Sequence, residues 1–229
     1  MRFEILDTAQ EVCSAAADYI SENFPEHGVL GVATGNTQVP LYQELAQRAP
    51  LIVSKAFALD EYVGLSQDDP RSFYSYLKKL VEGPLGFDAG TIRVPKGSAL
   101  DLDQEASEFE SEMVQHPVDL QILGVGTNGH VAFNEPRSDP ESKTRVVMLS
   151  QETRIANRAD FGDLAPEAAI SQGIATILRA KKLVLIATGK SKAHALSMLL
   201  AGVENPEYPV TYLAGHPGLV VFADKAAAS

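Results

Sequence analysis

One loop of this sequence carries the residue types that proton-transfer chemistry needs. Residues 124–136 read GVGTNGHVAFNEP and include Asn128, His130 and Glu135. Histidine is the side chain that most readily takes and releases a proton near neutral pH. Glu135 follows His130 by five positions, which on a helix would put the two on different faces, so a pairing requires loop or extended backbone. The competing interpretation is a glycine-rich turn with a solvated histidine and a glutamate that caps the next helix.

A second group with chemical potential is the carboxylate pair Asp60 and Glu61, which follows the apolar stretch 54–59. Two carboxylates at the end of a buried strand are costly to bury without partners. They are therefore either solvated or functional, and their position alone leaves both interpretations open.

Two further loops join a strand-like stretch to a helix in a way that suits an anion. The first consists of Thr34, Gly35, Asn36 and Thr37. Its backbone N–H groups and the N-terminus of the following helix would face a bound anion. The alternative is that the threonines and the asparagine simply cap that helix.

The second such loop is 188–192, which ends in Lys192 immediately before a predicted helix. A helix N-terminus disfavours a cation unless an anion lies between the two. Lys192 is therefore a candidate anion ligand, and the alternative is a lysine on the surface.

The hydrophobic pattern predicts the elements that position these loops. Strands are predicted at 2–6, 29–33, 54–59, 91–94, 118–123, 145–149, 182–187 and 219–223, and helices at 8–24, 39–49, 71–82, 101–116, 166–178 and 193–202. Thr8 and Glu11 form a capping-box signature for the first helix. The alternation predicts an α/β fold over residues 1–229: a single domain with a doubly wound, mainly parallel sheet and helices on both faces. Ligands bind at the carboxyl ends of the strands in such sheets.

Composition narrows the class of partner. The 229 residues carry a net charge of −11, which argues against a nucleic-acid binder but not against a small anionic substrate. The single cysteine, Cys13, excludes an internal disulfide framework and suits a reducing compartment, so a cytoplasmic location is expected. The sequence has no apolar run of 18 residues, so no membrane span is expected, and its Cys and His spacing predicts no zinc site.

Three strings carry a family resemblance: LDEYVGL at 59–65, GVGTNGHVAFNEP at 124–136, and TGNT at 34–37. Together they resemble the glucosamine-6-phosphate deaminases in their short, non-extended form, and the likeness continues to His216 and Pro217. The resemblance implies a Rossmann-like fold and the isomerising deamination of D-glucosamine 6-phosphate to D-fructose 6-phosphate and ammonia. It implies no metal or organic cofactor, a small sugar phosphate as partner, and a monomer or small homo-oligomer.

The resemblance also implies catalytic roles. Asp60 corresponds to the base that moves a proton from C2 toward C1, and His130 to the group that opens the sugar ring. Glu135 corresponds to the partner that holds the imidazole tautomer. Asn128 stands where the long members of the family carry an aspartate, so Glu135 must orient His130 without that carboxylate.

The phosphate ligands implied by the resemblance are Thr34, Gly35, Asn36, Thr37 and Lys192. A further phosphate arginine of the family matches Arg158 only after a displacement of one position.

Two other functions compete with this one: a 6-phosphogluconolactonase on the same scaffold, and a non-catalytic sugar-phosphate sensor. The sensor normally carries a DNA-binding segment, and this sequence has no basic region for one. Residues 137–165 are predicted to form a mobile lid, because Pro136, Pro140 and Gly162 bracket polar residues there.

Overall fold

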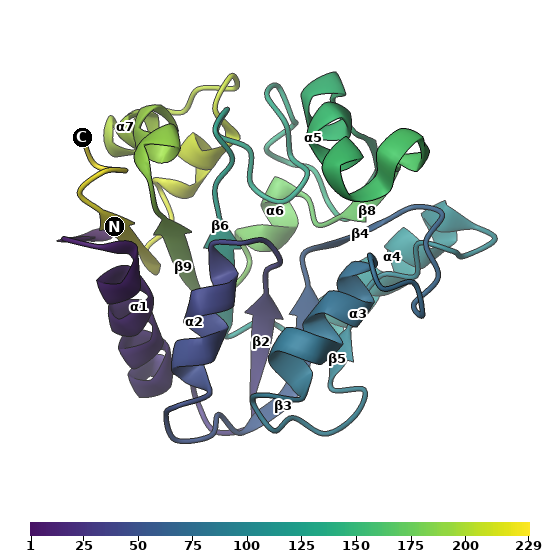
Figure 1. The fold of residues 1–229 in the computed structure, drawn as a ribbon, viewed down its shortest axis with the longest axis horizontal. Coiled ribbons are helices and arrows are strands. Elements are labelled where there is room, and N and C mark those ends of the chain that lie inside the picture. Colours follow the sequence, from purple (N-terminus) through teal and green to yellow (C-terminus); the bar gives the residue numbers. More distant parts are fainter.

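A parallel sheet forms the centre of the chain in the computed structural model, which describes residues 1–229 apart from the side chains at positions 156, 160 and 163. Its strands lie in the order β1-β10-β9-β6-β2-β3-β5 (Figure 1). Their bounds are β1 (Arg2–Leu6), β2 (Gly28–Val32), β3 (Val53–Ala58), β5 (Ile92–Arg93), β6 (Leu120–Gly124), β9 (Lys182–Ala187) and β10 (Leu219–Asp224). Each neighbouring pair is parallel, which confirms the predicted sheet.

Helices cover both faces of this sheet: α1, α2 and α3 lie in front of it in Figure 1, and α4 and α6 lie behind. The helices are α1 (Ala9–Asn23), α2 (Gln38–Leu45), α3 (Phe73–Leu77), α4 (Leu102–Gln115), α5 (Gln151–Phe161), α6 (Ile174–Ile177) and α7 (Ala193–Leu200). Helix α1 starts with the predicted capping box, in which the side chains of Thr8 and Glu11 each accept a hydrogen bond from the other's backbone N–H. Among the described residues, no helix is both long and apolar enough to cross a membrane.

The order of the strands reverses between β2 and β6. From β2 the chain continues to β3 on one side, whereas from β6 it continues to β9 and β10 on the other. At such a reversal the loops that leave the two strands diverge, and a crevice opens at the carboxyl ends. The loop 34–37 follows β2 and the loop 125–130 follows β6, so both predicted chemical loops leave the sheet at this point.

A second, antiparallel sheet stands beside the first and has the order β4-β8-β7. Its strands are β4 (Asp60–Tyr62), β7 (Arg145–Met148) and β8 (Ala168–Ser171). The helix predicted over 166–178 is therefore wrong for its first half, and only Ile174–Ile177 is helical. The spacing of Ile170 and Ile174 fits a helix, but Ile170 is paired on both sides, with Glu61 and Val146, so neighbouring strands satisfy the backbone there.

Glu61 ties the small sheet to α3. Its buried carboxylate accepts hydrogen bonds from the backbone N–H groups of Tyr62 at 2.9 Å, Phe73 at 3.0 Å and Tyr74 at 2.9 Å. Two of these donors belong to the first turn of α3, where a negative charge is favourable. Burial raises the pKa of Glu61, and the three backbone donors oppose that rise.

An aromatic cluster connects the small sheet with α5. The Tyr62 ring lies 4.6 Å from that of Phe73 and 5.4 Å from that of Phe161, and its hydroxyl donates to Asn157 Oδ1 at 3.1 Å. Helix α5 is thereby packed against the strand that carries Asp60. The segment 137–165 contains β7 and α5, and its movement as a lid stays a prediction.

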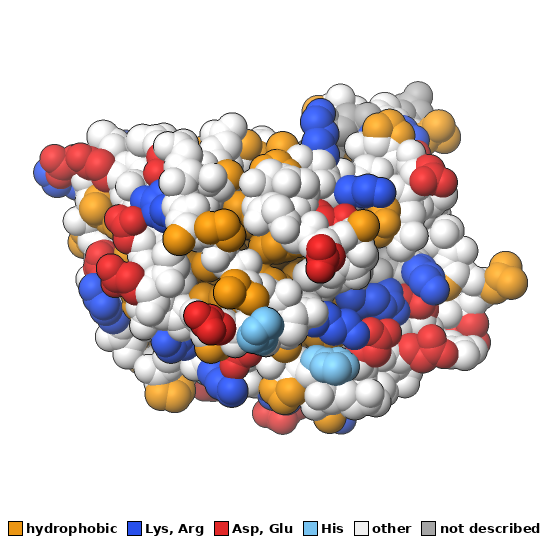
Figure 2. All heavy atoms as spheres, turned by 90° about the horizontal axis from the view of Figure 1, so that it is seen from below, with side chains coloured by type: hydrophobic (Ala, Val, Ile, Leu, Met, Phe, Trp, Pro, Cys, Tyr) orange, Lys and Arg blue, Asp and Glu red, His pale blue; other side chains and the backbone are white. Residues whose placement is uncertain are grey.

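Figure 2 shows the molecule from below, at the end of the sheet away from the carboxyl ends of its parallel strands. Acidic and basic side chains are interspersed there, and no basic stripe runs across the part of this face that the structure describes. This distribution agrees with the net charge of −11 in giving no electrostatic footprint for nucleic acid on this face.

We expect a Gly97→Ala substitution to destabilise the small sheet, because a Cβ at Gly97 would overlap the backbone carbonyl of Tyr62. Overpacking of this kind costs about 1–3 kcal/mol of unfolding free energy. The matched control is Gly83→Ala, whose added Cβ would meet its nearest atom, Lys78 O, at an ordinary 3.5 Å. Urea unfolding of both variants measures the difference. Equal stability of the two would show that the backbone at Gly97 yields without cost.

Candidate active site

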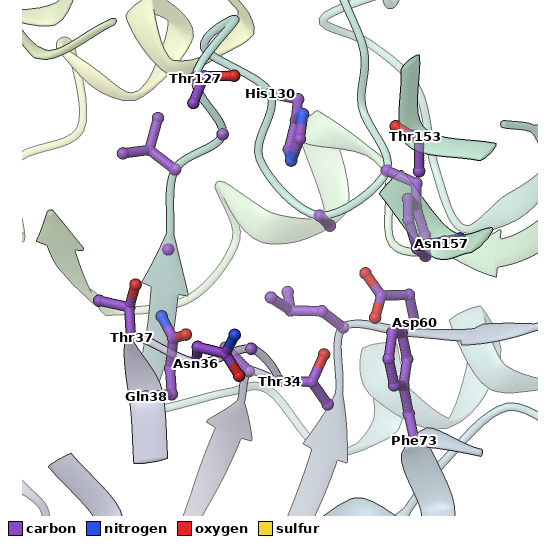
Figure 3. A pocket seen from close by; sticks show the side chains of 18 of the residues that line it. Thr34, Asn36, Thr37, Gln38, Asp60, Phe73, Thr127, His130, Thr153 and Asn157 are labelled. Atoms are coloured by element: carbon purple, nitrogen blue, oxygen red, sulfur yellow. The ribbon is translucent and has the colours of Figure 1, made fainter. Parts of the chain in front are cut away.

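A cavity of about 450 Å³ opens at the carboxyl ends of β2 and β6 (Figure 3). Seven of the predicted site residues line it: Thr34, Gly35, Asn36, Thr37, Asp60, His130 and Lys192. Asn128 and Glu135 lie behind His130 and hold its loop. Arg158 is the one predicted site residue that the structure places elsewhere.

The loop after β2 forms the floor of the cavity. Gly35 has a φ of 113°, a backbone conformation that favours glycine, and its carbonyl accepts a hydrogen bond from the N–H of Gln38 at the start of α2. Thr37 occupies the N-cap position of α2, yet its side chain makes no capping hydrogen bond. The side chain of Thr37 therefore does not act as the helix cap that the alternative interpretation of this loop predicted.

Lys192 enters the cavity from the loop after β9, at the start of α7. It is half-buried, and burial lowers the pKa of its ammonium group. A partly desolvated ammonium gains more from an anion beside it than a solvated one does. Among the described side chains that line the cavity, it is the only lysine or arginine.

Asp60 stands on β4 at the other end of the cavity from Thr37 (Figure 3). Its side chain is nearly buried, with 5% of the residue exposed. Burial, reinforced by the negative charge of Glu61, raises the pKa of Asp60 to about 8. The two carboxylates thus differ in environment: three backbone N–H groups bind Glu61, while Asp60 faces open space.

His130 is held by the glycine-rich loop after β6. Its ring packs so closely over Gly126 that a Cβ at that position would overlap the imidazole. Gly129 has a φ of 82°, and the backbone N–H of His130 donates to Asn128 Oδ1 at 3.2 Å. The Nδ1 atom of His130 lies 3.6 Å from Glu135 Oε2. His130 and Glu135 approach each other through loop backbone, as their five-residue spacing requires.

Glu135 is surrounded by donors. Asn128 Nδ2 donates to Oε2 at 2.8 Å, and Thr153 Oγ1 donates to Oε1 at 2.7 Å. Burial raises the pKa of Glu135, but His130, Thr153 and Asn128 outweigh that effect and hold it at about 2. A fixed negative charge beside Nδ1 favours the tautomer that carries its proton there, which leaves Nε2 for a ligand in the cavity.

Arg158 lies on α5 outside the cavity. The hollow that it lines instead is shared with Arg154 and Glu167. Its neighbour Asn157 lines the cavity, and one residue along a helix is a turn of about 100°. The displacement by one position therefore points Arg158 away from the site in this structure.

Several lining residues were missed from the sequence: Gln38, Tyr62, Phe73, Thr127, Phe133, Thr153 and Asn157. Thr153 and Asn157 are four residues apart on α5, a spacing that puts both on one helix face and could have indicated them. Gln38 gave no such signal, because a glutamine in the first turn of a helix is unremarkable. Among the described side chains, no group of three or more His, Cys, Asp and Glu is arranged to hold a metal ion.

The arrangement can perform acid–base chemistry on a phosphorylated ligand. A loop of backbone donors and a lysine occupy one part of the cavity, and a histidine and a protonatable carboxyl occupy the other. An anion anchored at the first part would place the atoms several bonds away between Asp60 and His130.

Comparisons with known proteins agree with this geometry. Residues 5–221 match the family described as glucosamine-6-phosphate isomerases/6-phosphogluconolactonase. A glucosamine-6-phosphate deaminase of Rhodopirellula baltica is 39% identical over 239 aligned positions, which cover 100% of this chain and 95% of the relative.

Solved structures show the same relationship. A monomeric glucosamine-6-phosphate deaminase superposes with a TM-score of 0.94 at 34% identity, covering 100% of this chain and 99% of its own. The 6-phosphogluconolactonase of Trypanosoma brucei superposes with a TM-score of 0.79 at 19% identity, covering 99% of this chain and 97% of its own. At 19% identity, the similarity to the 6-phosphogluconolactonase shows a shared fold only.

The pKa of Asp60 makes a prediction about stability. The folded chain keeps the proton of Asp60 up to a pH of about 8, whereas an unfolded aspartate ionises near pH ~3.9. The unfolded state therefore binds fewer protons between these values, and wild-type stability falls as the pH rises through that window. We expect Asp60→Asn to remove this loss, so that its stability advantage over wild type grows up to about pH 8 and then levels off, at on the order of a few kcal/mol.

Urea unfolding at pH 5, 7 and 9 tests this expectation. Asp68→Asn is the control, because Asp68 is an exposed aspartate in the loop that follows β4. Parallel pH profiles for wild type and Asp60→Asn would contradict the raised pKa.

Proposed function

The chain belongs to the family of glucosamine-6-phosphate isomerases and 6-phosphogluconolactonases, and we propose that it is a glucosamine-6-phosphate deaminase. The reaction converts D-glucosamine 6-phosphate and water to D-fructose 6-phosphate and ammonia. Full-length similarity to deaminases, at 34–39% identity, supports this choice within the family. The observation that carries it is a nearly buried carboxyl, Asp60, in the same cavity as His130.

The phosphate is proposed to bind at the floor of the cavity. Loop 34–37 offers backbone N–H groups at the start of α2, and Lys192 offers a positive charge. Binding there leaves the far end of the sugar, C1 and C2, free to reach the other end of the cavity. Phosphate binding energy can then hold the reacting carbons in place.

His130 is proposed to open the sugar ring. Nε2 accepts the proton of the O1 hydroxyl and keeps it, and water delivers a proton to the ring oxygen as the C1–O5 bond breaks. Glu135 stabilises the imidazolium that forms, and Asn128 holds both Glu135 and the backbone of His130. In this scheme a neutral amide takes part in positioning, and Glu135 supplies the negative charge.

Asp60 is proposed to move the proton from C2 to C1. It must be ionised to do so, and the ammonium group that the substrate carries at C2 would favour ionisation by its positive charge. The C2–H bond breaks, its electron pair forms the C1=C2 bond, and the carbonyl oxygen at C1 takes a proton from His130. The ammonium group at C2 loses one proton to water, which leaves an enol with a neutral amine. Asp60 then returns its proton to C1, and the nitrogen lone pair forms the iminium at C2. Water attacks this iminium, and ammonia departs as the C2 carbonyl forms.

Glu61 is an unsuitable alternative base. Its carboxylate is occupied by three backbone donors, and it does not line the cavity. Moving it would break the contacts that join β4 to α3.

We expect a monomer or a small homo-oligomer in a cytoplasmic setting. The structural relative of TM-score 0.94 is described as monomeric, which supports a monomer or a small homo-oligomer here. The single cysteine, Cys13, is buried and unpaired, which suits a reducing, cytoplasmic setting.

Solvent exchange separates the proposed reaction from lactone hydrolysis, because only the isomerising deamination breaks a C–H bond. We expect wild type, incubated with fructose 6-phosphate and ammonium in heavy water, to place deuterium at C2 of the glucosamine 6-phosphate formed and at C1 of the recovered ketose. Asp60→Asn should lose exchange by at least about 100-fold, the scale of general base catalysis, and still bind the sugar phosphate. Hydrolysis of 6-phosphogluconolactone without exchange would replace the proposed function. Normal exchange by Asp60→Asn would move the base elsewhere.

Thr153 is proposed to position Glu135, and thereby His130. We expect Thr153→Val to lower kcat by about tenfold, the effect of losing one hydrogen bond to a charged group, with KM changed far less. Thr153→Ser keeps the hydroxyl and should restore most of kcat. Thermal unfolding of the three proteins is the control. A kcat loss that serine does not rescue, or one that follows a loss of stability, would leave Thr153 without this role.

A further inference from the structure

Gln38 has a buried side-chain amide without a partner for its nitrogen. Only 2% of the residue is exposed, and Nε2 makes no hydrogen bond to the residues that the structure describes. Buried polar groups are satisfied in the large majority of cases, so such an atom calls for an explanation. Gln38 also lines the cavity, and the mechanism above does not use it.

The amide of Gln38 fits between Gly35 and Gly124 because neither residue has a side chain. A Cβ at Gly124, the last residue of β6, would come within 2.7 Å of Nε2, and a Cβ at Gly35 would come within 3.1 Å of Oε1. The amide therefore sits over the carboxyl ends of β2 and β6, where the strand order reverses. Figure 3 shows it beside Thr37 and Asn36, at the end of the cavity away from Asp60.

The charge of the cavity floor points to the same role. A sugar phosphate brings up to two negative charges, and Lys192 is the one lysine or arginine among the described side chains that line the cavity. Arg158 lines a different hollow. Neutral N–H donors must therefore carry a large share of phosphate binding, as they do in other anion sites built on backbone and amide groups.

We propose that Gln38 binds the phosphate of the substrate, with Nε2 as the donor to a phosphate oxygen. This inference rests on the proposed function for the identity of the sugar phosphate, but not for the anion site itself. Nε2 is itself buried in the free protein, so the amide must turn toward the cavity to reach the anion, and it gives up no protein hydrogen bond when it does so. The same atom is unsatisfied in the free protein, so Gln38 lowers stability there in exchange for affinity.

Two substitutions separate a phosphate ligand from a structural residue. Gln38→Met keeps the length of the side chain and removes the donor, and Gln38→Glu keeps the shape and adds a negative charge. Gln43→Met is the matched control, because Gln43 is an exposed glutamine on the same helix. Lys192→Ala is the positive control for loss of phosphate binding.

The measurements are KM and kcat for glucosamine 6-phosphate, the dissociation constant of inorganic phosphate by calorimetry, and thermal unfolding. For Gln38→Met we expect KM and the phosphate dissociation constant to rise together by about tenfold or more, equivalent to about 1.4 kcal/mol. We expect kcat to change far less, and the unfolding temperature to stay equal or rise. Gln38→Glu should weaken phosphate binding further, and Gln43→Met should match wild type.

Three results would overturn the inference. The first is an unchanged phosphate dissociation constant in Gln38→Met, even if KM rises, because the contact would then be to the sugar. The second is a lower unfolding temperature for Gln38→Met, which would show that the amide has a structural partner. The third is phosphate binding by Gln38→Glu as tight as in wild type. If wild type releases no ammonia but its phosphate binding still depends on Gln38, the proposed function fails and the anion site stands.

Discussion

The reversal of strand order between β2 and β6 is the constraint on which the site depends. Parallel strands send their connections away from each other at this point, so no element of the main sheet covers the carboxyl ends of these two strands. The cavity floor is consequently made of short loops with fixed ends. Gly35 and Gly124 mark those ends, and the absence of side chains there lets the amide of Gln38 approach both strands.

Three carboxyl groups near the cavity have been given different tasks by their surroundings. Glu61 is bound by backbone donors and joins two elements, and Glu135 is bound by side-chain donors and lies 3.6 Å from the imidazole of His130. Asp60 has burial without such donors, so its proton affinity is high. The residue type is nearly the same in all three, and the number of hydrogen bonds decides which one is able to exchange a proton with a ligand.

The sequence predicted the main sheet well, because its strands are apolar stretches bounded by glycine and polar loops. It also indicated Asp60 and His130 as chemical residues. It did not predict the small sheet: β4 has three residues, too few for any periodicity, and the helical spacing of Ile170 and Ile174 predicts a helix where 168–171 is a strand. Pairing with strands distant in sequence decided the outcome there. Gln38 was missed for a related reason, since only the packing around it shows that its amide lacks a partner.

The division of the cavity into two halves has a consequence for how such enzymes diversify. The half proposed to hold an anion belongs to the loops of the parallel sheet, and so does His130, whereas Asp60 and Thr153 come from the small sheet and α5. Substitutions or insertions in the small sheet and α5 can therefore change the reaction while the binding of a phosphorylated substrate stays the same. A shared parallel sheet would then be compatible with a family whose description names both glucosamine-6-phosphate isomerases and 6-phosphogluconolactonase.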